Sequence, residues 1–142
     1  MANITTYGYG ANNRLVSDQT TGSNAHSYAY SYDANSGRLT SNETGYASTW
    51  MYDPAGRMAT MISNTGLTTY TFSSNGNLTG VSESTGLTTM AYDKENRLNV
   101  YQNAGTIVTH VYYADNMKAS ETFGNLTTIL LWDGSNYLQG RD

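Results

Sequence analysis

The chain alternates between short segments in which every second residue is apolar or aromatic and short segments rich in Gly, Asn, Asp and Ser. A period of two is typical of β-strands, and no apolar pattern of helical period is present. Thr, Tyr and Val favour strands, and the single Pro stands in a turn segment. The pattern predicts strands of about six residues separated by turns, for example at 66–72, 86–92 and 106–112.

Aromatic residues recur every 20 residues and define an internal repeat, so we call them landmark residues. They are Tyr32, Tyr52, Phe72, Tyr92, Tyr112 and Trp132, with an earlier one at Tyr9, 23 residues before Tyr32. Each repeat carries two turn signals, which predicts two strands per repeat and roughly a dozen strands in about six repeats. The expected fold is all-β, an antiparallel β-hairpin repeat array that coils into a spiral or curved sheet, because so many twisted strands rarely stay flat.

At 142 residues the chain has the size of one ordinary domain. We expect a single repeat array over residues 1–142, without an internal linker. Within it we expect a divergent first repeat at 1–31, regular repeats at 32–131 and a partial last repeat at 132–142.

A motif of Asp, then Gly or Asn, then Arg follows several landmark residues. Gly and Asn tolerate the positive φ that hairpin loops of three to five residues commonly require, and an Asp side chain can accept hydrogen bonds from turn amides. Asp and Arg four residues apart are close enough to pair, but an exposed pair contributes only about 0–1 kcal/mol, so turn geometry should dominate. The turn at 33–37 reads as one residue longer than the others. The candidate turn residues are Asp33, Gly37, Arg38, Asp53, Gly56, Arg57, Asp93, Asn96, Arg97 and Asp133.

Strand phase places a ladder of aromatic side chains on one face of the predicted sheet and aliphatic residues such as Leu67, Leu87 and Ile107 on the other. Neither face is purely polar, so burial on both sides and a wet side with stacked Tyr rings are both open. The rings either fill the interior of the array, which we favour, or offer flat apolar faces to a sugar or a protein. The candidate ladder consists of Tyr32, Trp50, Tyr52, Tyr70, Phe72, Tyr92, Tyr112 and Trp132.

Composition narrows the classes of function. Seven basic and 11 acidic residues give a net charge of −4, which argues against nucleic-acid binding. With two His and no Cys the chain lacks material for a nucleophilic triad, and backbone hydrogen bonding in turns accounts for the repeated Asp, so we predict no enzyme, no cofactor and no metal. The start of the chain lacks the features of a signal peptide, and the longest aliphatic run, 129–132, is too short to span a membrane.

The repeated unit is Tyr-Asp-x-x-Gly-Arg-Leu followed by a Gly-x-Thr-x-Tyr-x-Tyr strand, and close copies begin at Tyr32, Tyr52 and Tyr92. It resembles the YD repeats of Rhs proteins, of the large subunits of ABC-type insecticidal toxin complexes and of teneurins, over about residues 7–142. The resemblance implies a β-sheet spiral wound into a hollow shell, which in bacterial members can enclose a toxic C-terminal segment. This chain, which has too few repeats for a shell, would be a piece of such a wall. Where Gly10, Ser73 and Tyr113 replace the motif Asp, we expect looser turns.

We therefore expect a structural β-repeat scaffold, either a segment of an Rhs/YD-type shell wall or a self-associating surface assembly module. Its partners would be other copies, through open sheet ends that offer unpaired amides and carbonyls, or the rest of a larger Rhs-type protein. The alternative is an adhesion or carbohydrate-binding module that uses the Tyr/Trp ladders to bind a glycan or protein partner. The resemblance implies an extracellular or cell-surface location on bacteria.

Overall fold

The computed structural model describes residues 2–141, and in this range the chain consists of β-strands and turns with one short 3-10 segment at Ala11–Asn13. Fourteen strands of the described range form a sheet in which the strands follow one another in sequence order, with β1 and β14 at its edges. The pairs are antiparallel, as between β1 and β2 or between β9 and β10. The prediction of an all-β antiparallel array is confirmed. In the described range we find no helix with the length and apolar character needed to cross a membrane.

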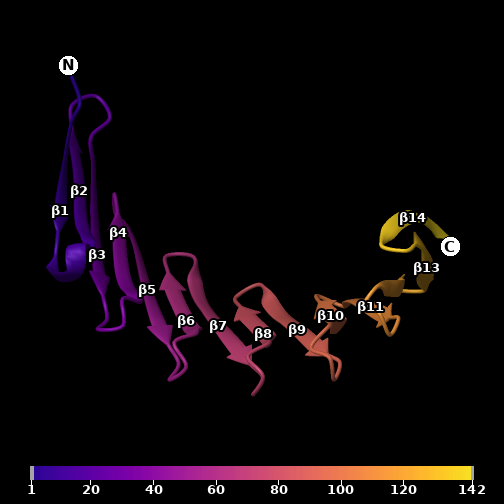
Figure 1. The fold of residues 1–142 in the computed structure, drawn as a ribbon. Helices are drawn as coiled ribbons and strands as arrows, with labels where there is room; N and C mark the ends of the chain where they lie inside the picture. The colour runs from indigo at the N-terminus through magenta and orange to yellow at the C-terminus, as the bar shows by residue number, and fades with distance from the viewer. Residues whose placement is uncertain (1, 142) are drawn as a thin grey trace. The chain divides into compact units, whose positions relative to one another are not determined.

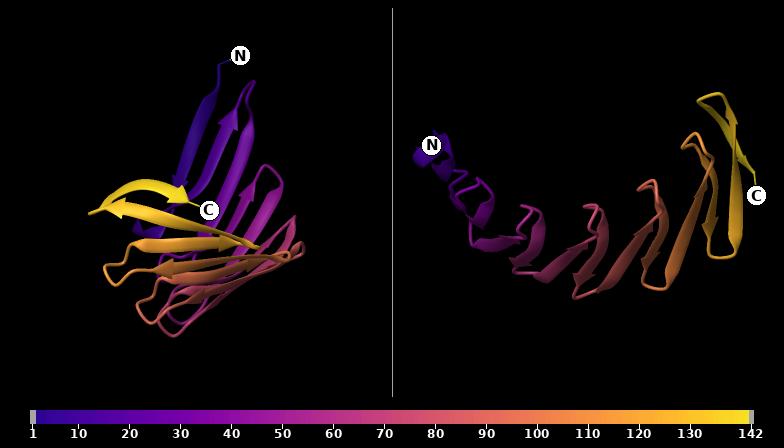
Figure 2. Two further views of the ribbon diagram at one scale, coloured as in Figure 1. Left: turned by 90° about the vertical axis from the view of Figure 1, so that its right-hand side faces the viewer. Right: turned by 60° about the horizontal axis from the view of Figure 1, so that its bottom comes forward.

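The chain divides into two compact units, one ending at Thr69 and the other beginning at Tyr70. In each unit successive strands follow one another side by side, as the labels in Figure 1 and the two views in Figure 2 show. The first unit contains β1 (Ile4–Tyr9), β2 (Leu15–Thr21), β3 (His26–Tyr32), β4 (Arg38–Glu43), β5 (Tyr46–Tyr52), β6 (Met58–Ser63) and the first residues of β7 (Gly66–Phe72). The second contains the rest of β7 and β8 (Leu78–Glu83), β9 (Gly86–Tyr92), β10 (Leu98–Asn103), β11 (Thr106–Tyr112), β12 (Lys118–Phe123), β13 (Leu126–Asp133) and β14 (Asn136–Arg141).

Two kinds of strand alternate along the chain. An odd-numbered strand, here called a landmark strand, ends at or next to a landmark residue, and the even-numbered strand after it is called a return strand. Long turns of five residues lead from the first six landmark strands to their return strands, for example 53–57 and 93–97, whereas two residues connect β13 to β14. Short turns lead on to the next landmark strand, and at 44–45 and 104–105 both turn residues have positive φ, the conformation that matches the twist of a two-residue hairpin.

A β-bulge accompanies most landmark residues, where a landmark strand pairs with the return strand that follows it. In the second unit Val111 pairs with Ser120, but Tyr112 pairs with Lys118, so one residue of β12 has no partner in the ladder. The same register shift occurs at Tyr9, Tyr32, Tyr52, Tyr92 and Trp132. A bulge of this kind increases twist and releases backbone groups from the ladder, so the landmark position is where the sheet needs additional hydrogen bonds.

The sheet carries no hydrophobic core of its own. No hydrophobic side chain of the described range is buried, and the buried residues are Gly80 and the polar Thr20, Ser41 and Thr68. Side chains on the aromatic face, such as Met90 and Tyr92 of β9, are half-buried, whereas Leu87 and Ala91 on the opposite face of that strand are exposed. The question of which face is better covered is thus answered in favour of the aromatic face, where neighbouring side chains shield one another.

Candidate functional site

The long turns form the most regular feature of the described residues and share two backbone features, although the turn at 10–14 has a second positive φ at Asn12. They lie at 10–14, 33–37, 53–57, 73–77, 93–97 and 113–117, and in each the N–H of the first residue donates to the carbonyl of the fifth at 2.8–2.9 Å. The fourth residue has a positive φ in all six: Asn13 (54°), Ser36 (72°), Gly56 (75°), Gly76 (86°), Asn96 (62°) and Asn116 (72°). The motif positions Gly56 and Asn96 therefore meet a backbone requirement that Gly and Asn satisfy at least cost.

The turn at 33–37 is not longer than the others, contrary to the expectation from its sequence. Asp33 N–H bonds to the carbonyl of Gly37, as Asp53 N–H bonds to that of Arg57, so the period of 20 is kept. Ser36 takes the positive φ, and Gly37 occupies the place of Arg57. A Cβ on Gly37 would lie 2.8 Å from Asp33 Oδ2 and 2.9 Å from Tyr52 Cε2, so this Gly is required by close approach instead of by its φ.

Turns that lack the motif Asp are not looser in the backbone. The first-to-fifth hydrogen bond measures 2.9 Å at Gly10 and 2.8 Å at both Ser73 and Tyr113, the same as in the Asp turns. Ser73 Oγ also accepts from Asn77 N–H at 3.2 Å, which reproduces one contact of the Asp side chain. The expectation of looser turns is wrong, because the fourth-residue φ and the strand register already fix the backbone.

Asp53 and Asp93 are the residues that organise the complete motif turns. Asp53 Oδ1 accepts from the amides of Ala55 and Arg57, both at 2.9 Å, and its Oδ2 accepts from Arg57 Nε at 2.7 Å. Asp93 makes the equivalent bonds at 3.0, 2.9 and 2.7 Å. The backbone hydrogen bond from Arg57 is the main reason that the pKa of Asp53 lies below its usual value. Desolvation opposes the shift at Asp93, but hydrogen bonds from the backbone and side chain of Arg97 still lower its pKa.

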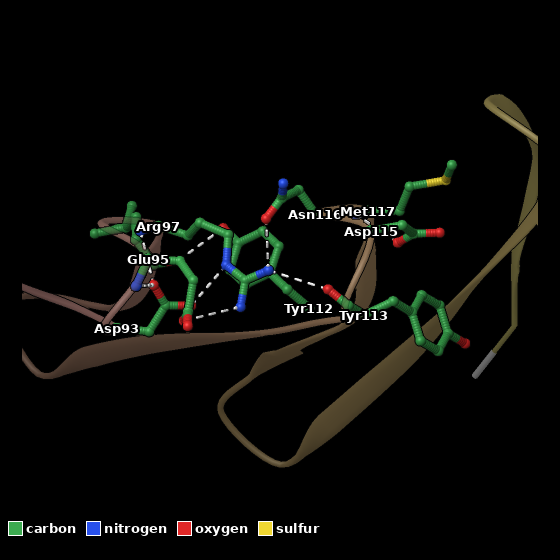
Figure 3. A network of polar contacts seen from close by, with 9 residues as sticks. Asp93, Glu95, Arg97, Tyr112, Tyr113, Asp115, Asn116 and Met117 are labelled. Atoms are coloured by element: carbon green, nitrogen blue, oxygen red, sulfur yellow. Dashed lines mark hydrogen bonds and ion pairs between the residues drawn. The ribbon is translucent and has the colours of Figure 1, made fainter.

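Arg97 connects its own long turn to the next one, as Figure 3 shows. Beyond Asp93, its Nη1 donates to the carbonyl of Tyr113 and to Asn116 Oδ1, both at 3.0 Å. Its guanidinium lies 4.8 Å from the centre of the Tyr112 ring. Arg14 repeats the arrangement in the first unit, where its Nη1 donates to the Asp33 carbonyl at 2.8 Å. A planar cation with five donors suits this task, since it can stack on a ring and bond two turns at once.

The landmark side chain supplies the second link between consecutive repeats. Tyr112 hydroxyl donates at 2.8 Å to the carbonyl of Leu98, the first residue of the preceding return strand. Trp132 Nε1 bonds the carbonyl of Lys118 at 2.8 Å, and Tyr52 hydroxyl bonds that of Arg38 at 2.9 Å. Each of these carbonyls lies outside the residue pairs that the return strand forms with the next landmark strand. In β10, for example, the pairs with β11 include Val100 but not Leu98. We call this contact the landmark clamp; Tyr32 makes it to the carbonyl of Leu15 at 2.9 Å.

Arginines also cover several ring faces of the predicted ladder. Arg38 lies 5.6 Å from the centre of the Trp50 ring and 5.2 Å from that of Tyr30, and Arg14 lies 5.1 Å from that of Tyr32. Arg38, which the sequence placed in the turn motif, thus begins β4 and stacks on rings of the two adjacent landmark strands. Tyr70, Phe72 and Tyr92 are half-buried on the same face as the other ladder residues of their strands.

Asp133 does not occupy a long turn, although the motif suggested one. It is the last residue of β13 and pairs with Asn136 across the two residues Gly134 and Ser135. A turn-forming Gly directly after the Asp, with positive φ of 57°, closes a two-residue connection before the five-residue one can form. The last predicted repeat therefore ends differently from the others.

A small cluster of titratable groups lies on the aromatic face of the second unit. Lys118 Nζ donates to Glu121 Oε2 at 2.9 Å, and His110 Nδ1 lies 3.3 Å from the same oxygen. Desolvation, reinforced by Lys118, lowers the pKa of His110, and the hydrogen bond from Lys118 lowers the pKa of Glu121. Between residues 2 and 141 no group of three or more His, Cys, Asp or Glu side chains could hold a metal ion.

Comparison with known proteins matches residues 1–133 to the family described as Teneurin YD-shell. Solved structures of similar fold include TcdB2-TccC3, with a TM-score of 0.76, 15% identity and coverage of 97% of this chain. TcdB2-TccC3-TEV has a TM-score of 0.76 and 13% sequence identity, and the match covers 88% of this chain. The Photorhabdus luminescens Tc holotoxin pore has a TM-score of 0.75 and 13% sequence identity, and the match covers 90% of this chain. This chain spans only 8–9% of the length of those chains. No curated protein matches. The long turns, the 20-residue period and the match over 133 residues agree, and the chain belongs to the teneurin YD-shell family.

Proposed function

We propose that the chain is a structural segment of a β-sheet wall and that its work is to extend and stiffen that wall. The observation that carries the proposal is the absence of a buried hydrophobic residue in the described range combined with strong bonds along the sheet. Landmark clamps at Tyr32, Tyr52, Tyr112 and Trp132 and arginine bonds from Arg14 and Arg97 join neighbouring repeats, so cohesion runs from strand to strand. A protein that acts alone as a compact catalyst or receptor buries its own core instead.

Surface area supports the same conclusion. The chain exposes 9574 Å², whereas a compact monomer of 15.5 kDa exposes about 7,200 Å² by the usual scaling with mass. The excess of roughly 2,400 Å² is comparable to what large permanent interfaces bury. Exposed apolar side chains such as Leu87, Ile107 and Ile129 contribute to it. A wall segment surrounded by further wall and by contents or partners would cover this area.

The partner that suits such a segment is the rest of a larger assembly. TcdB2-TccC3 and the Tc holotoxin pore contain a region with this fold within chains more than ten times longer. By analogy, this chain would work as part of a toxin-related assembly outside the cell or at its surface. The proposed role is not enzymatic, because the motif carboxylates Asp33, Asp53 and Asp93 are engaged in hydrogen bonds from backbone amides of their own turns.

Carbohydrate binding through the aromatic ladder has no supporting observation. A sugar ring stacks on an open aromatic face, but Trp50, Tyr32 and Tyr112 each have a guanidinium over the ring. The same rings also donate to backbone carbonyls at Tyr32 and Tyr112, which fixes them within the sheet. Their arrangement fits lateral packing between strands.

Grafting tests the proposed function. The segment of TcdB2-TccC3 that superimposes on this chain would be replaced by this chain, and the product examined by electron microscopy and by resistance to protease. A wall segment should give an ordered, protease-resistant assembly. The matched control is a graft without β14 (Asn136–Arg141), which has an odd number of strands and reverses the direction of every strand that follows. An unfolded product from the intact graft would refute the proposal.

A further inference from the structure

The two outer strands of the sheet are of complementary kinds. Among residues 2–141, β1 is bonded to β2 and β14 to β13, so each has one unpaired edge. β1 is a landmark strand and β14 is a return strand. Because the two kinds alternate through the sheet, the edge of β14 calls for a landmark strand and the edge of β1 for a return strand. A second copy of the chain supplies both.

Every pair of a return strand with the following landmark strand has one register. In a return strand, one residue pairs with the preceding landmark residue across the bulge, as Lys118 pairs with Tyr112. The residue two places after it pairs with the residue three places before the next landmark residue, as Ser120 pairs with Ile129. The pairs are Ser17 with Ala29, Thr40 with Thr49, Thr60 with Thr69, Gly80 with Thr89, Val100 with Thr109 and Ser120 with Ile129. This constancy lets the register be applied to the unpaired edges.

We propose that β14 of one copy pairs with β1 of a second copy in this same register. Tyr137 of β14 pairs with the landmark residue Trp132, as Lys118 of β12 pairs with Tyr112. Gln139, two places after Tyr137, therefore corresponds to Ser120 of β12. Tyr9 is the landmark residue of β1, and Thr6 lies three places before it. Gln139 therefore pairs with Thr6 of the second copy, and the Tyr9 hydroxyl of that copy donates to the Tyr137 carbonyl as a landmark clamp. The inference rests on the proposed wall function and names its partner.

The composition of the β1 edge and the exposure of Tyr9 and Tyr137 support pairing. β1 contains no charged residue and no Pro, the features with which natural edge strands prevent association. Tyr9 is 63% exposed and Tyr137 55% exposed, whereas the landmark residues Tyr52 and Tyr112 inside the units are half-buried. The new contact would give Tyr9 the surroundings that the interior landmark residues already have. The contact is heterologous, so successive copies form either a ring or a filament.

Sedimentation of the purified chain over a wide range of concentration tests self-pairing. The average mass should rise above 15.5 kDa as concentration increases. Tyr9→Phe removes the clamp hydroxyl and should weaken association about 3- to 10-fold, the value of one hydrogen bond. Tyr7→Phe is the matched control, because Tyr7 is an exposed ring of the same strand at a position without a clamp carbonyl, and it should leave association unchanged. A strict monomer at every concentration, or equal effects of both variants, would overturn the proposal.

Cross-linking tests the register directly, since the chain has no Cys. A Thr6→Cys protein mixed with a Gln139→Cys protein and oxidised should give a mixed disulfide, because directly paired residues have Cα atoms within disulfide range. Thr6→Cys mixed with Arg141→Cys, two residues out of register on the same face, should give little. Equal yields would contradict the register. If the graft into TcdB2-TccC3 succeeds while this chain stays monomeric, the wall function stands and self-pairing fails. If the graft is unfolded while the mass of the free chain rises with concentration, the wall function fails and the pairing of β14 with β1 stands.

Discussion

Replacing Tyr112 with Phe isolates the landmark clamp from every other contact of the ring. The hydroxyl donates to the Leu98 carbonyl at 2.8 Å, while the ring lies under the Arg97 guanidinium at 4.8 Å. Phe keeps the ring and its stacking and removes only the donor. Phe72 stands at the same repeat position in this chain, so the substitution creates no new shape.

The magnitude follows from the contact that is lost. An intramolecular hydrogen bond makes a net contribution of about 0.5–1.5 kcal/mol to stability. Without the Tyr112 hydroxyl, the Leu98 carbonyl can bind water, because both residues are only half-buried. We therefore expect Tyr112→Phe to lower the free energy of unfolding by about 1 kcal/mol. In a chain of this length that corresponds to a fall in Tm of roughly 2–4 °C.

Urea titration followed by far-ultraviolet circular dichroism measures the change, and amide hydrogen exchange locates it in β10 and β11. Repeat arrays need not unfold in one step, so the local measurement is required. Tyr113→Phe is the control, since Tyr113 is an exposed neighbour in the next long turn. Equal stability of the two variants, with unchanged exchange in β10, would refute the role of the clamp.

The other predictions concern the long turns and pH. Gly37→Ala should lower the free energy of unfolding by about 1–3 kcal/mol, because the added Cβ would meet Asp33 and Tyr52. Ser36→Gly should raise it by up to about 1 kcal/mol, because Gly tolerates the positive φ of 72° better than Ser. Thermal unfolding of the two variants checks both signs. Lowered pKa values of Asp53 and Asp93 mean that their stabilisation is present above the unfolded value of 3.8 and is lost as pH falls through the folded values. The lowered pKa of His110 acts in the same direction below 6.5, so urea midpoints should fall from pH 8 to 5.5 and fall again towards pH 3, and His110→Gln should remove the first step.

The sequence was sufficient for the fold because one physical signal was repeated many times. Alternation, the 20-residue spacing of landmark residues and the Gly or Asn at Gly56, Gly76 and Asn96 all indicated strands and turns that the structure has. The error at 33–37 arose because Gly was assigned to a positive φ, whereas Gly37 is required by the approach of the Tyr52 ring from the next repeat. Such a contact lies outside the local sequence window.

The landmark clamp was also missed, although a signal for it existed. Tyr or Trp at the landmark position carries a polar handle that Phe lacks, and a half-buried donor of this kind usually has a partner. The partner is a carbonyl 14 residues earlier in Tyr52, Tyr112 and Trp132, which only the bulged register reveals. Asp133 shows the reverse case, in which a local Gly overrides a repeat motif.

The identical register of return and landmark strands has a consequence for how such genes change. Excision or duplication of 20 residues between equivalent points would rejoin the strands in the register that they already had. No central core would have to be redesigned, since each repeat is held by the repeats beside it. Recombination between repeats can therefore alter the length of the array in whole steps while each step keeps its stability.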